Sequence, residues 1–388
     1  MKPLPKTTEM KYAIPFNRPF IVGKELYYIA QAVIDGRLSG DGPYSKKCQA
    51  WLENVLGCSR AFLTHSCTAA LEMSAILCNI GAGDEVILPS FTFVSTANAF
   101  VLRGGVPVFV DIRPDTLNLD ENLIEQAITE KTKAIVPVHY AGVGCEMDKI
   151  MTLANSRHIW VIEDAAQALL SKKGDQYLGT IGHLGCISFH ETKNIISGEG
   201  GALLVNDGGL VQRAEIIREK GTNRNQFFRG EVDKYTWMDI GSSFLPGELV
   251  GAFLFAQLEQ SGKIITARKR LFDRYLQGLQ PLADKGLLRL PIANGQRDYN
   301  GHIFYILTND LATRTKLIEH LKRKGIYAVF HYIPLHSSPA GRRFGRVGGS
   351  MQVTTDISER LLRLPLYYEM TEADLDLVIA EIINFFTK

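Results

Sequence analysis

Short apolar runs alternate with helical segments from residue 61 to about residue 220. The runs are rich in Val and Ile and carry few polar positions, which is typical of strands buried on both faces of a sheet. They are AFLT (61–64), EVILP (85–89), VPVFVDI (106–112), AIVPVHY (134–140) and IWVIED (159–164). The segments between them predict helices over 69–80, 95–103, about 120–129 and 146–157. This alternation predicts an α/β fold, a mostly parallel sheet flanked by helices, whose ligands bind beyond the carboxyl ends of the strands.

The pattern changes after residue 240. Residues 248–280 predict one or two long helices that leave the large domain. Beyond them, strand-like runs at 302–308 and 326–334 and helices near 313–324 and 371–386 predict a smaller α+β domain. We therefore expect a large domain over residues 1–262, of which 1–13 are flexible, and a small C-terminal domain over 263–388.

Composition excludes several classes of protein. Apolar residues make up 46% of the chain and charged residues 22%, and the formal net charge is +2, which argues against a surface built for nucleic acid. The six cysteines form no CxxC pair, so we expect no metal site and a reducing compartment. Neither a secretory signal nor a membrane span is recognisable, so the sequence predicts a soluble cytoplasmic protein.

Three places carry candidate chemistry. Ser66 and Thr68 lie between a strand end and a helix start, where hydroxyl groups cap backbone N–H groups and where phosphate also binds. Asp164 ends a buried strand, either as a helix cap or as the partner of a cation. Lys193 lies between the apolar segments CISF and GGALLV, so its amine forms an ion pair, contacts phosphate or bonds to a cofactor.

Together these three places fit one ligand, pyridoxal 5′-phosphate. The lysine amine condenses with its aldehyde, the aspartate keeps its pyridine nitrogen protonated, and the helix start takes its phosphate. An aromatic side chain should cover the ring, and Phe91 and Phe93 follow a strand at the appropriate edge, although simple core packing is the alternative for both.

Several motifs then identify a family resemblance over nearly the whole chain, from about Ile14 to the C-terminus. They are CTAAL, PSFTFVSTANAF, VPVFVDI, IEDAAQA, GCISFHETKN, GEGGAL and FHYIPLH. These segments resemble the sugar-nucleotide aminotransferases, a branch of the fold type I pyridoxal phosphate enzymes. The resemblance implies transfer of an amino group from L-glutamate to a nucleotide-linked keto sugar, and a homodimer with a shared active site.

The same resemblance implies roles for individual residues. Lys193 would form the imine with the cofactor and later move the proton, and Asp164 would pair with the pyridine nitrogen. The remaining cofactor contacts would come from Ser66, Cys67, Thr68, Phe93, Gln167 and Ser188. Many relatives complete the phosphate site with an Asn of the partner subunit in a GYN motif, and Ser243 of GSSF stands at that position here.

Substrate contacts are implied further along the chain. His331, Tyr332 and His336 of FHYIPLH would face the sugar and diphosphate, with core or surface positions as the alternative. Arg224 and Arg229 of GTNRNQFFRG would neutralise the diphosphate, and a solvated loop is the alternative for them.

Three alternative functions remain to be weighed against amino transfer. A related branch of sugar dehydratases has His in place of the lysine, so Lys193 favours transamination. A nicotinamide-dependent enzyme would need a glycine fingerprint, and AGVGCEMDK (141–149) lacks the third Gly. A non-catalytic relative would keep the fold without the chemistry, and the intact Lys–Asp pair argues against it.

Overall fold

The computed structural model describes residues 12–292 and 297–387, so most of the segment expected to be flexible, 1–13, lies outside the described residues. Within these ranges the central sheet has eight strands in the order β1-β9-β8-β5-β4-β2-β3-β12. Their bounds are β1 (Arg60–Thr64), β2 (Glu85–Pro89), β3 (Val106–Val110), β4 (Thr132–Ile135), β5 (Trp160–Asp164), β8 (Leu184–Ser188), β9 (Gly201–Val205) and β12 (Arg346–Val347). Only β9 runs antiparallel to its neighbours, so the predicted mostly parallel sheet is confirmed.

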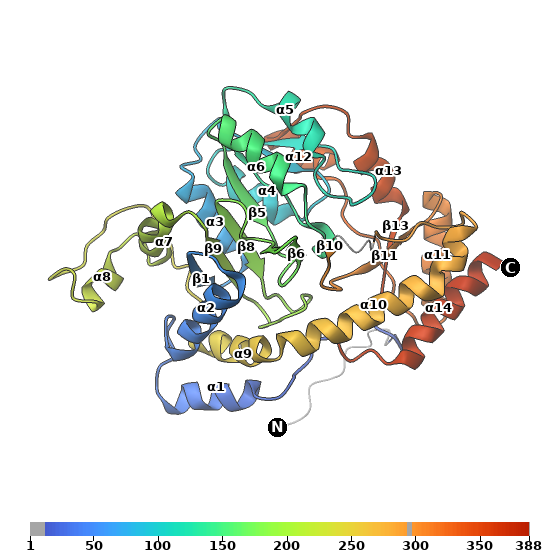
Figure 1. Ribbon diagram of the computed structural model, residues 1–388, viewed down its shortest axis with the longest axis horizontal. Helices are drawn as coiled ribbons and strands as arrows, with labels where there is room; N and C mark the ends of the chain where they lie inside the picture. Colours follow the sequence, from blue (N-terminus) through green and yellow to red (C-terminus); the bar gives the residue numbers. More distant parts are fainter. Residues whose placement is uncertain (1–11, 293–296, 388) are drawn as a thin grey trace.

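Helices cover both faces of this sheet (Figure 1). Those of the first part of the chain are α1 (Glu25–Ile34), α2 (Pro43–Leu56), α3 (Cys67–Leu77), α4 (Val94–Val101), α5 (Ile124–Ala127), α6 (Met147–Ser156), α7 (Val211–Arg218), α8 (Arg224–Phe228) and α9 (Glu248–Glu259). Successive residues of a strand point to opposite faces. Leu203 and Val205 of β9 accordingly pack in the cluster that holds α3, whereas Ala202 and Leu204 pack with α2 and α9.

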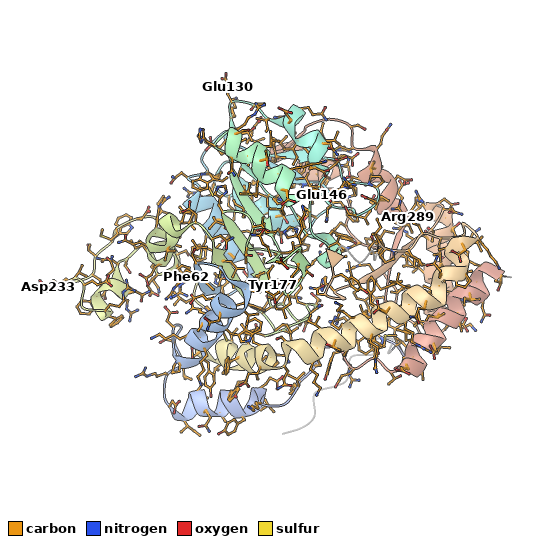
Figure 2. The ribbon with its side chains drawn as sticks, in the orientation of Figure 1. Phe62, Glu130, Glu146, Tyr177, Asp233 and Arg289 are labelled. Atoms are coloured by element: carbon orange, nitrogen blue, oxygen red, sulfur yellow. The ribbon has the colours of Figure 1, made fainter. Side chains whose placement is uncertain are left out.

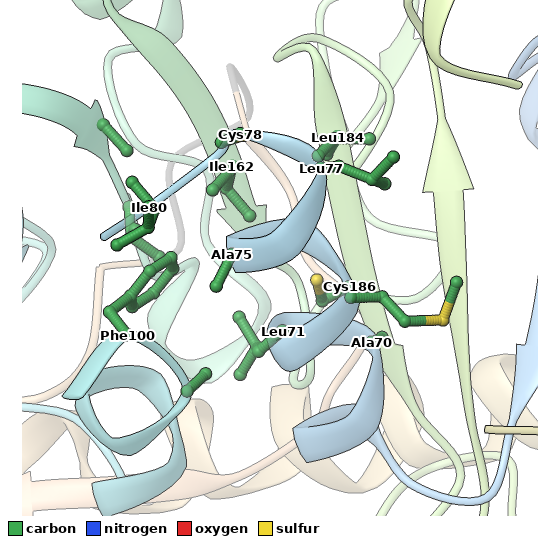
Figure 3. Packing of buried hydrophobic residues seen from close by; sticks show 14 of the residues in the cluster. Ala70, Leu71, Ala75, Leu77, Cys78, Ile80, Phe100, Ile162, Leu184 and Cys186 are labelled. Carbon is green, nitrogen blue, oxygen red and sulfur yellow. The ribbon is translucent and has the colours of Figure 1, made fainter. Parts of the chain in front are cut away.

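Helix α3 illustrates how completely the sheet is covered. Every residue of α3 from Ala69 to Leu77 except Glu72 is buried, because the helix lies between the sheet and its neighbours α4 and α7. Figure 3 shows Leu71 and Ala75 of α3 beside Phe100 of α4, with Cys186 of the sheet behind the helix. This packing fixes the N-terminus of α3 at the carboxyl edge of the sheet.

The C-terminal part is built around a long helix. Helix α10 (Ser261–Asp284) runs from beneath the central sheet to the far side of the molecule, where it packs against α14 (Glu372–Thr387) (Figure 1). There β11 (Phe304–Leu307) pairs with β13 (Leu361–Leu364) in an antiparallel ladder. The other elements of this part are α11 (Leu311–Arg323), α12 (Pro339–Phe344) and α13 (Gln352–Arg360), and a small separate sheet joins β6 (Lys172–Lys173), β7 (Gln176–Tyr177) and β10 (Arg297–Asp298).

One predicted strand is wrong. Residues 326–334 form no strand, only isolated bridges from Ile326 to Ile14 and from Val329 to Arg363. The pairing stops after Val329 because the carbonyl of Phe330 accepts hydrogen bonds from the Arg363 side chain instead of joining a ladder.

The predicted domain division near residue 262 falls in the first turn of α10 and stays a prediction. Two segments cross it: Ile14 packs in the C-terminal core, and β12 extends the central sheet beside β3. In the described ranges, no helix combines the length and the apolar character that crossing a bilayer requires.

The packing of α4 gives a stability prediction. Replacing the fully buried Phe100 with Ala leaves a cavity between α3, α4 and the sheet, so the free energy of unfolding should fall by about 3–5 kcal/mol. Urea denaturation measures the change. The matched control is Leu102→Ala at the end of the same helix, where the side chain is 71% exposed and the change should stay within about 0.5 kcal/mol. Equal losses in the two variants would contradict this account of the core.

Candidate active site

A cavity of about 830 Å³ opens at the carboxyl edge of the central sheet. Strands β1, β8 and β5 all end at this edge, because β1 and β8 are both antiparallel to the β9 strand between them and β8 is parallel to β5. The cavity brings together most of the predicted site residues: Ser66, Cys67, Thr68, Phe93, Asp164, Gln167, Ser188, Lys193, His331 and Tyr332.

The N-terminus of α3 forms one wall of the cavity. Ser66 is its N-cap, and its Oγ accepts a hydrogen bond from the backbone N–H of Ala69 at 3.1 Å. The N–H groups of Cys67 and Thr68 belong to the first turn, where a helix offers no internal acceptor. Gly201 of β9 lies so close that a Cβ there would overlap the backbone nitrogen of Cys67. The wall therefore presents free N–H groups and hydroxyls, the donor set that a phosphate needs.

Asp164, the last residue of β5, is buried and aimed at the cavity. Its Oδ2 accepts a hydrogen bond from Thr96 Oγ1 at 2.7 Å, and its Oδ1 accepts one from the N–H of Ala166 at 3.2 Å. Both contacts are donors to the carboxylate, so they fix its orientation. A carboxylate held in this way can pair with a protonated ring nitrogen.

The neighbouring Glu163 has a different role. It accepts hydrogen bonds from the N–H groups of Gly179, Ile181 and Gly182 and from Nε2 of His139, all within the protein. Since Nδ1 of His139 accepts from the N–H of Cys145, Nε2 carries the ring proton. Glu163 thus orders the chain on the far side of β5 and does not line the cavity.

Lys193 lies in the loop between β8 and β9 and lines the cavity together with Asp164. Its backbone N–H donates to His190 O at 2.8 Å, which closes a turn and carries the side chain into the cavity. Burial lowers the pKa of Lys193 below the ordinary lysine value; Asp164 opposes this shift and the Arg363 guanidinium adds to it. The amine is thus more readily deprotonated than a surface lysine, as a nucleophile or proton acceptor must be.

Aromatic and amide side chains form a second wall of the cavity. Gln167 Nε2 donates to Tyr332 Oη at 2.9 Å, while its Oε1 accepts the N–H of Ala141. The ring of Tyr332 stacks on His331 with centroids 3.6 Å apart, and His331 Nδ1 meets Tyr140 Oη at 2.7 Å. Burial holds the pKa of His331 well below its usual range, so the imidazole is neutral.

The two aromatic residues predicted to cover a bound ring, Phe91 and Phe93, differ in exposure. Phe91 is 1% exposed and packs against Tyr140 and Tyr332, as the core alternative proposed. Phe93 is 58% exposed and lines the cavity. Only Phe93 is placed to cover a ring bound there.

Four predicted residues lie elsewhere in this chain. His336 is bonded to Ser90, with Nδ1 and Oγ 2.7 Å apart. Ser243, Arg224 and Arg229 line a second cavity of about 920 Å³ beside α2 and α7. Within one chain, therefore, none of these four residues lines the cavity of Lys193.

Arg224 and Arg229 of the second cavity lie at the base of a projecting segment. Arg224 pairs with Glu219 at 3.3 Å, and Arg229 pairs with Glu215 and Glu231 at 2.7 and 2.6 Å. The segment that follows α8 extends away from the molecule, with Asp233 near its tip (Figure 2).

Some residues of the cavity were missed by the sequence reasoning. Thr96, the donor to Asp164, stands in the quoted motif PSFTFVSTANAF, but its hydroxyl was not considered. His302 joins the site through Asn194, since its Nδ1 lies 3.0 Å from Asn194 Oδ1. Arg363 offered a signal, a cation inside the apolar run LLRLPL, that the pattern analysis passed over.

Comparison with known proteins decides the family. The model of the DegT/DnrJ/EryC1/StrS aminotransferase family matches residues 20–383. The chain belongs to this family. Its reaction is accordingly the transfer of an amino group.

Relatives and solved structures agree over the whole chain. The spore coat polysaccharide biosynthesis protein SpsC of Bacillus subtilis is 31% identical over 94% of this chain and 95% of its own length. The aminotransferase TlmJ of Streptoalloteichus hindustanus superposes with a TM-score of 0.88 at 29% identity, covering 96% of this chain and 99% of that one. The putative sugar aminotransferase Spr1654 of Streptococcus pneumoniae, solved in its PLP form, gives a TM-score of 0.87 at 25% identity, covering 97% and 98%.

The environment of Lys193 gives a pH prediction. Because burial disfavours the ammonium, the amine of the cofactor-free protein should lose its proton at a lower pH than the ordinary lysine pKa of about 10.4. Competitive labelling with acetic anhydride across a pH series, read by mass spectrometry of the peptide that carries Lys193, measures the midpoint. Lys193→Ala is the control for peptide assignment. A midpoint at or above the ordinary value would contradict the assigned environment.

Proposed function

We propose that the protein moves the amino group of L-glutamate to the keto carbon of a nucleotide-linked 4-keto-6-deoxy sugar. One observation carries the proposal: Lys193, Asp164 and the N-terminus of α3 line the same cavity at the carboxyl edge of the sheet. As a member of its aminotransferase family, the protein is dependent on pyridoxal 5′-phosphate. When bound, this cofactor supplies the aldehyde that receives the amino group and the ring that accepts electrons from the reacting carbon.

The residues of the cavity fit the cofactor by their chemistry. The free N–H groups and hydroxyls of Ser66, Cys67 and Thr68 are suited to its phosphate, assisted by the hydroxyl of Ser188. Asp164, held by Thr96, is suited to the protonated ring nitrogen.

Three further side chains complete the proposed site. Gln167 is suited to the ring hydroxyl, Phe93 to the ring face, and Lys193 to the covalent bond with the cofactor. When it is not bonded to the cofactor, the amine of Lys193 would hold or move a proton at the reacting carbon, and its lowered pKa suits that task. His331 and Tyr332 then face the space left for the sugar.

The substrate proposal is narrower than the family. SGDGPYS, HETKN, REKGTNRNQFFRGEVDKYTW and VFHYIPLH resemble dTDP-4-amino-4,6-dideoxygalactose transaminase, an enzyme of enterobacterial common antigen synthesis. We therefore propose dTDP-4-dehydro-6-deoxy-D-glucose as the acceptor and dTDP-4-amino-4,6-dideoxy-D-galactose as the product. The name of SpsC, a polysaccharide biosynthesis protein, and that of Spr1654, a putative sugar aminotransferase, support a sugar acceptor in general.

A product analysis tests this substrate. With glutamate as donor and dTDP-, UDP- and GDP-linked keto sugars as acceptors, the 4-amino-4,6-dideoxygalactose product should form fastest from the dTDP sugar. Amination at C3, a preference for UDP or GDP sugars, or dehydration without amino transfer would each overturn the narrower proposal.

Lys193→Ala should abolish amino transfer, because no other amine replaces the one bonded to the cofactor and moving the proton. The measurement is turnover with glutamate and the dTDP sugar, together with borohydride trapping and peptide mapping, which should label Lys193 in the unmodified protein. Circular dichroism shows whether the variant keeps its fold. Near-normal turnover, or a label on another residue, would refute the assignment.

We also propose a homodimer in which the second cavity serves the partner's site. In one chain Arg224, Arg229 and Ser243 face a cavity that lacks Lys193. The projecting segment near them exposes Phe228, Trp237 and Met238 at 66, 79 and 55%, an apolar surface that a second copy would cover.

Mixed dimers test the shared site. Arg229→Ala and Lys193→Ala should each be impaired alone, yet a mixture refolded together should recover activity, since one site per hybrid dimer regains both groups. Glu231→Ala, which removes an ion-pair partner of Arg229 and leaves Arg229 in place, should retain activity alone. No recovery in the mixture, with dimers shown by light scattering, would place Arg229 in its own subunit's site or in none.

A further inference from the structure

Arg363 places a guanidinium in the active-site cavity, where it has no carboxylate partner among the described residues. It lies on β13, and its side chain reaches the cavity of Lys193, where it is the one arginine among the described lining residues. Burial lowers its pKa, and the groups that act on its charge are the phenols of Tyr140, Tyr332 and Tyr327. Arg363 is half-buried, and a guanidinium partly removed from water without a counter-charge is favoured when a ligand supplies that charge.

The guanidinium is held so that one edge stays open. Nε and Nη2 both donate to the carbonyl of Phe330, at 3.3 and 3.1 Å. The ring of Phe16 covers its face, with Cζ 4.7 Å from the ring centroid. Together these contacts fix the plane of the group and occupy the edge formed by Nε and Nη2.

The opposite edge has no acceptor within the protein. A guanidinium carries five N–H groups, and those of Nη1, with the second of Nη2, meet no acceptor among the described residues. Two parallel N–H groups on one edge match the two oxygens of a carboxylate. Arg268 differs in position: it is fully buried, donates through Nε and Nη2 to the carbonyls of Gly301, His302 and Leu366, and lines no part of this cavity, although its own Nη1 has no acceptor among the described residues.

The position of Arg363 relates it to the reaction. Its charge lowers the pKa values of Lys193, His302 and His331, so it lies within electrostatic reach of the reacting amine. Both histidines are neutral, and the amine of Lys193 would be bonded to the cofactor when the donor enters. Arg363 is then the lasting positive charge available to an anionic substrate on this side of the cavity.

We propose that the open edge of Arg363 binds a carboxylate of the amino donor and so selects a dicarboxylic amino acid over an uncharged amine. This inference rests on the proposed function, because it concerns the first half of that reaction. The sugar enters the same cavity without a carboxylate, so Arg363 distinguishes the donor from the acceptor.

The test separates donor binding from the rest of the reaction. The holoenzyme is mixed with glutamate, and bleaching of its yellow colour is followed against glutamate concentration. Arg363→Gln should raise the half-saturating glutamate concentration at least about tenfold, since a charge-assisted bidentate contact is lost. Arg363→Lys keeps the positive charge but loses the two parallel N–H groups. Its half-saturating glutamate concentration should lie between those of Arg363→Gln and the wild type.

A second readout does not depend on turnover. Glutarate, a dicarboxylate without an amine, should bind the wild-type holoenzyme in isothermal titration calorimetry and fail to bind Arg363→Gln. The matched control is Arg274→Gln, an exposed arginine paired with Asp376 on the far helix α14, which should behave as the wild type in both assays. Thermal unfolding and the cofactor absorbance show whether each variant is folded and loaded.

The outcomes are distinct from those for the proposed function. A half-saturating glutamate concentration of Arg363→Gln within about twofold of the wild-type value would overturn the carboxylate site. If Arg363→Gln does not fold, glutarate binding to Arg363→Lys that equals binding to the wild type would overturn it. Failure of the proposed function would appear in the second half-reaction, as a bleached enzyme that donates its amine to no keto sugar.

Discussion

The parallel pairing of β5 with β8 is the constraint on which the site depends. Asp164 is paired with Cys186, two residues before the end of β8, so the aspartate and the loop that carries Lys193 emerge at the same edge. Strand β9 then returns antiparallel between β8 and β1 and brings Gly201 against the first turn of α3. A shift of one residue in β5 would turn Asp164 to the other face of the sheet and Glu163 into its place.

The two adjacent carboxylates show what this register achieves. Glu163 is satisfied by three backbone N–H groups and by Nε2 of His139, so its hydrogen-bonding capacity is used within the protein. Asp164 receives two donors from the described part of the chain, and it lines the cavity. One carboxylate therefore maintains the fold and the other is left for a ligand, which is how a buried acidic side chain can be tolerated and still be functional.

Much of this arrangement follows from the sequence. The five apolar runs predicted as strands 61–164 correspond to β1 to β5, because continuous Val- and Ile-rich segments have few alternatives to a doubly covered sheet. Ser66, Asp164 and Lys193 were predicted to meet because parallel strands present their carboxyl ends at one edge. The strand predicted for residues 326–334 is wrong because an apolar pattern does not reveal that the Phe330 carbonyl bonds to a side chain.

The residues that the sequence did not yield are those whose role depends on distant partners. Thr96 matters because it contacts an aspartate 68 positions away, and Asn194 because it meets His302, 108 positions away. No local pattern carries that information.

A cavity that serves two substrates in turn must recognise each without excluding the other. The wall formed by Gln167, His331 and Tyr332 offers hydrogen bonds and stacking, which suit an uncharged sugar ring. These three side chains carry no fixed charge that a keto group would have to desolvate. A dicarboxylate needs the opposite, a cation that is already held in place. Arg363 supplies this cation in the same cavity. Its guanidinium is held by Phe16 from the N-terminal segment and by Phe330 from the C-terminal part. If the N-terminal segment and residue 330 together set the plane of one guanidinium, then donor recognition depends on how the two parts of the chain are joined, and not only on the lysine and aspartate at the sheet edge.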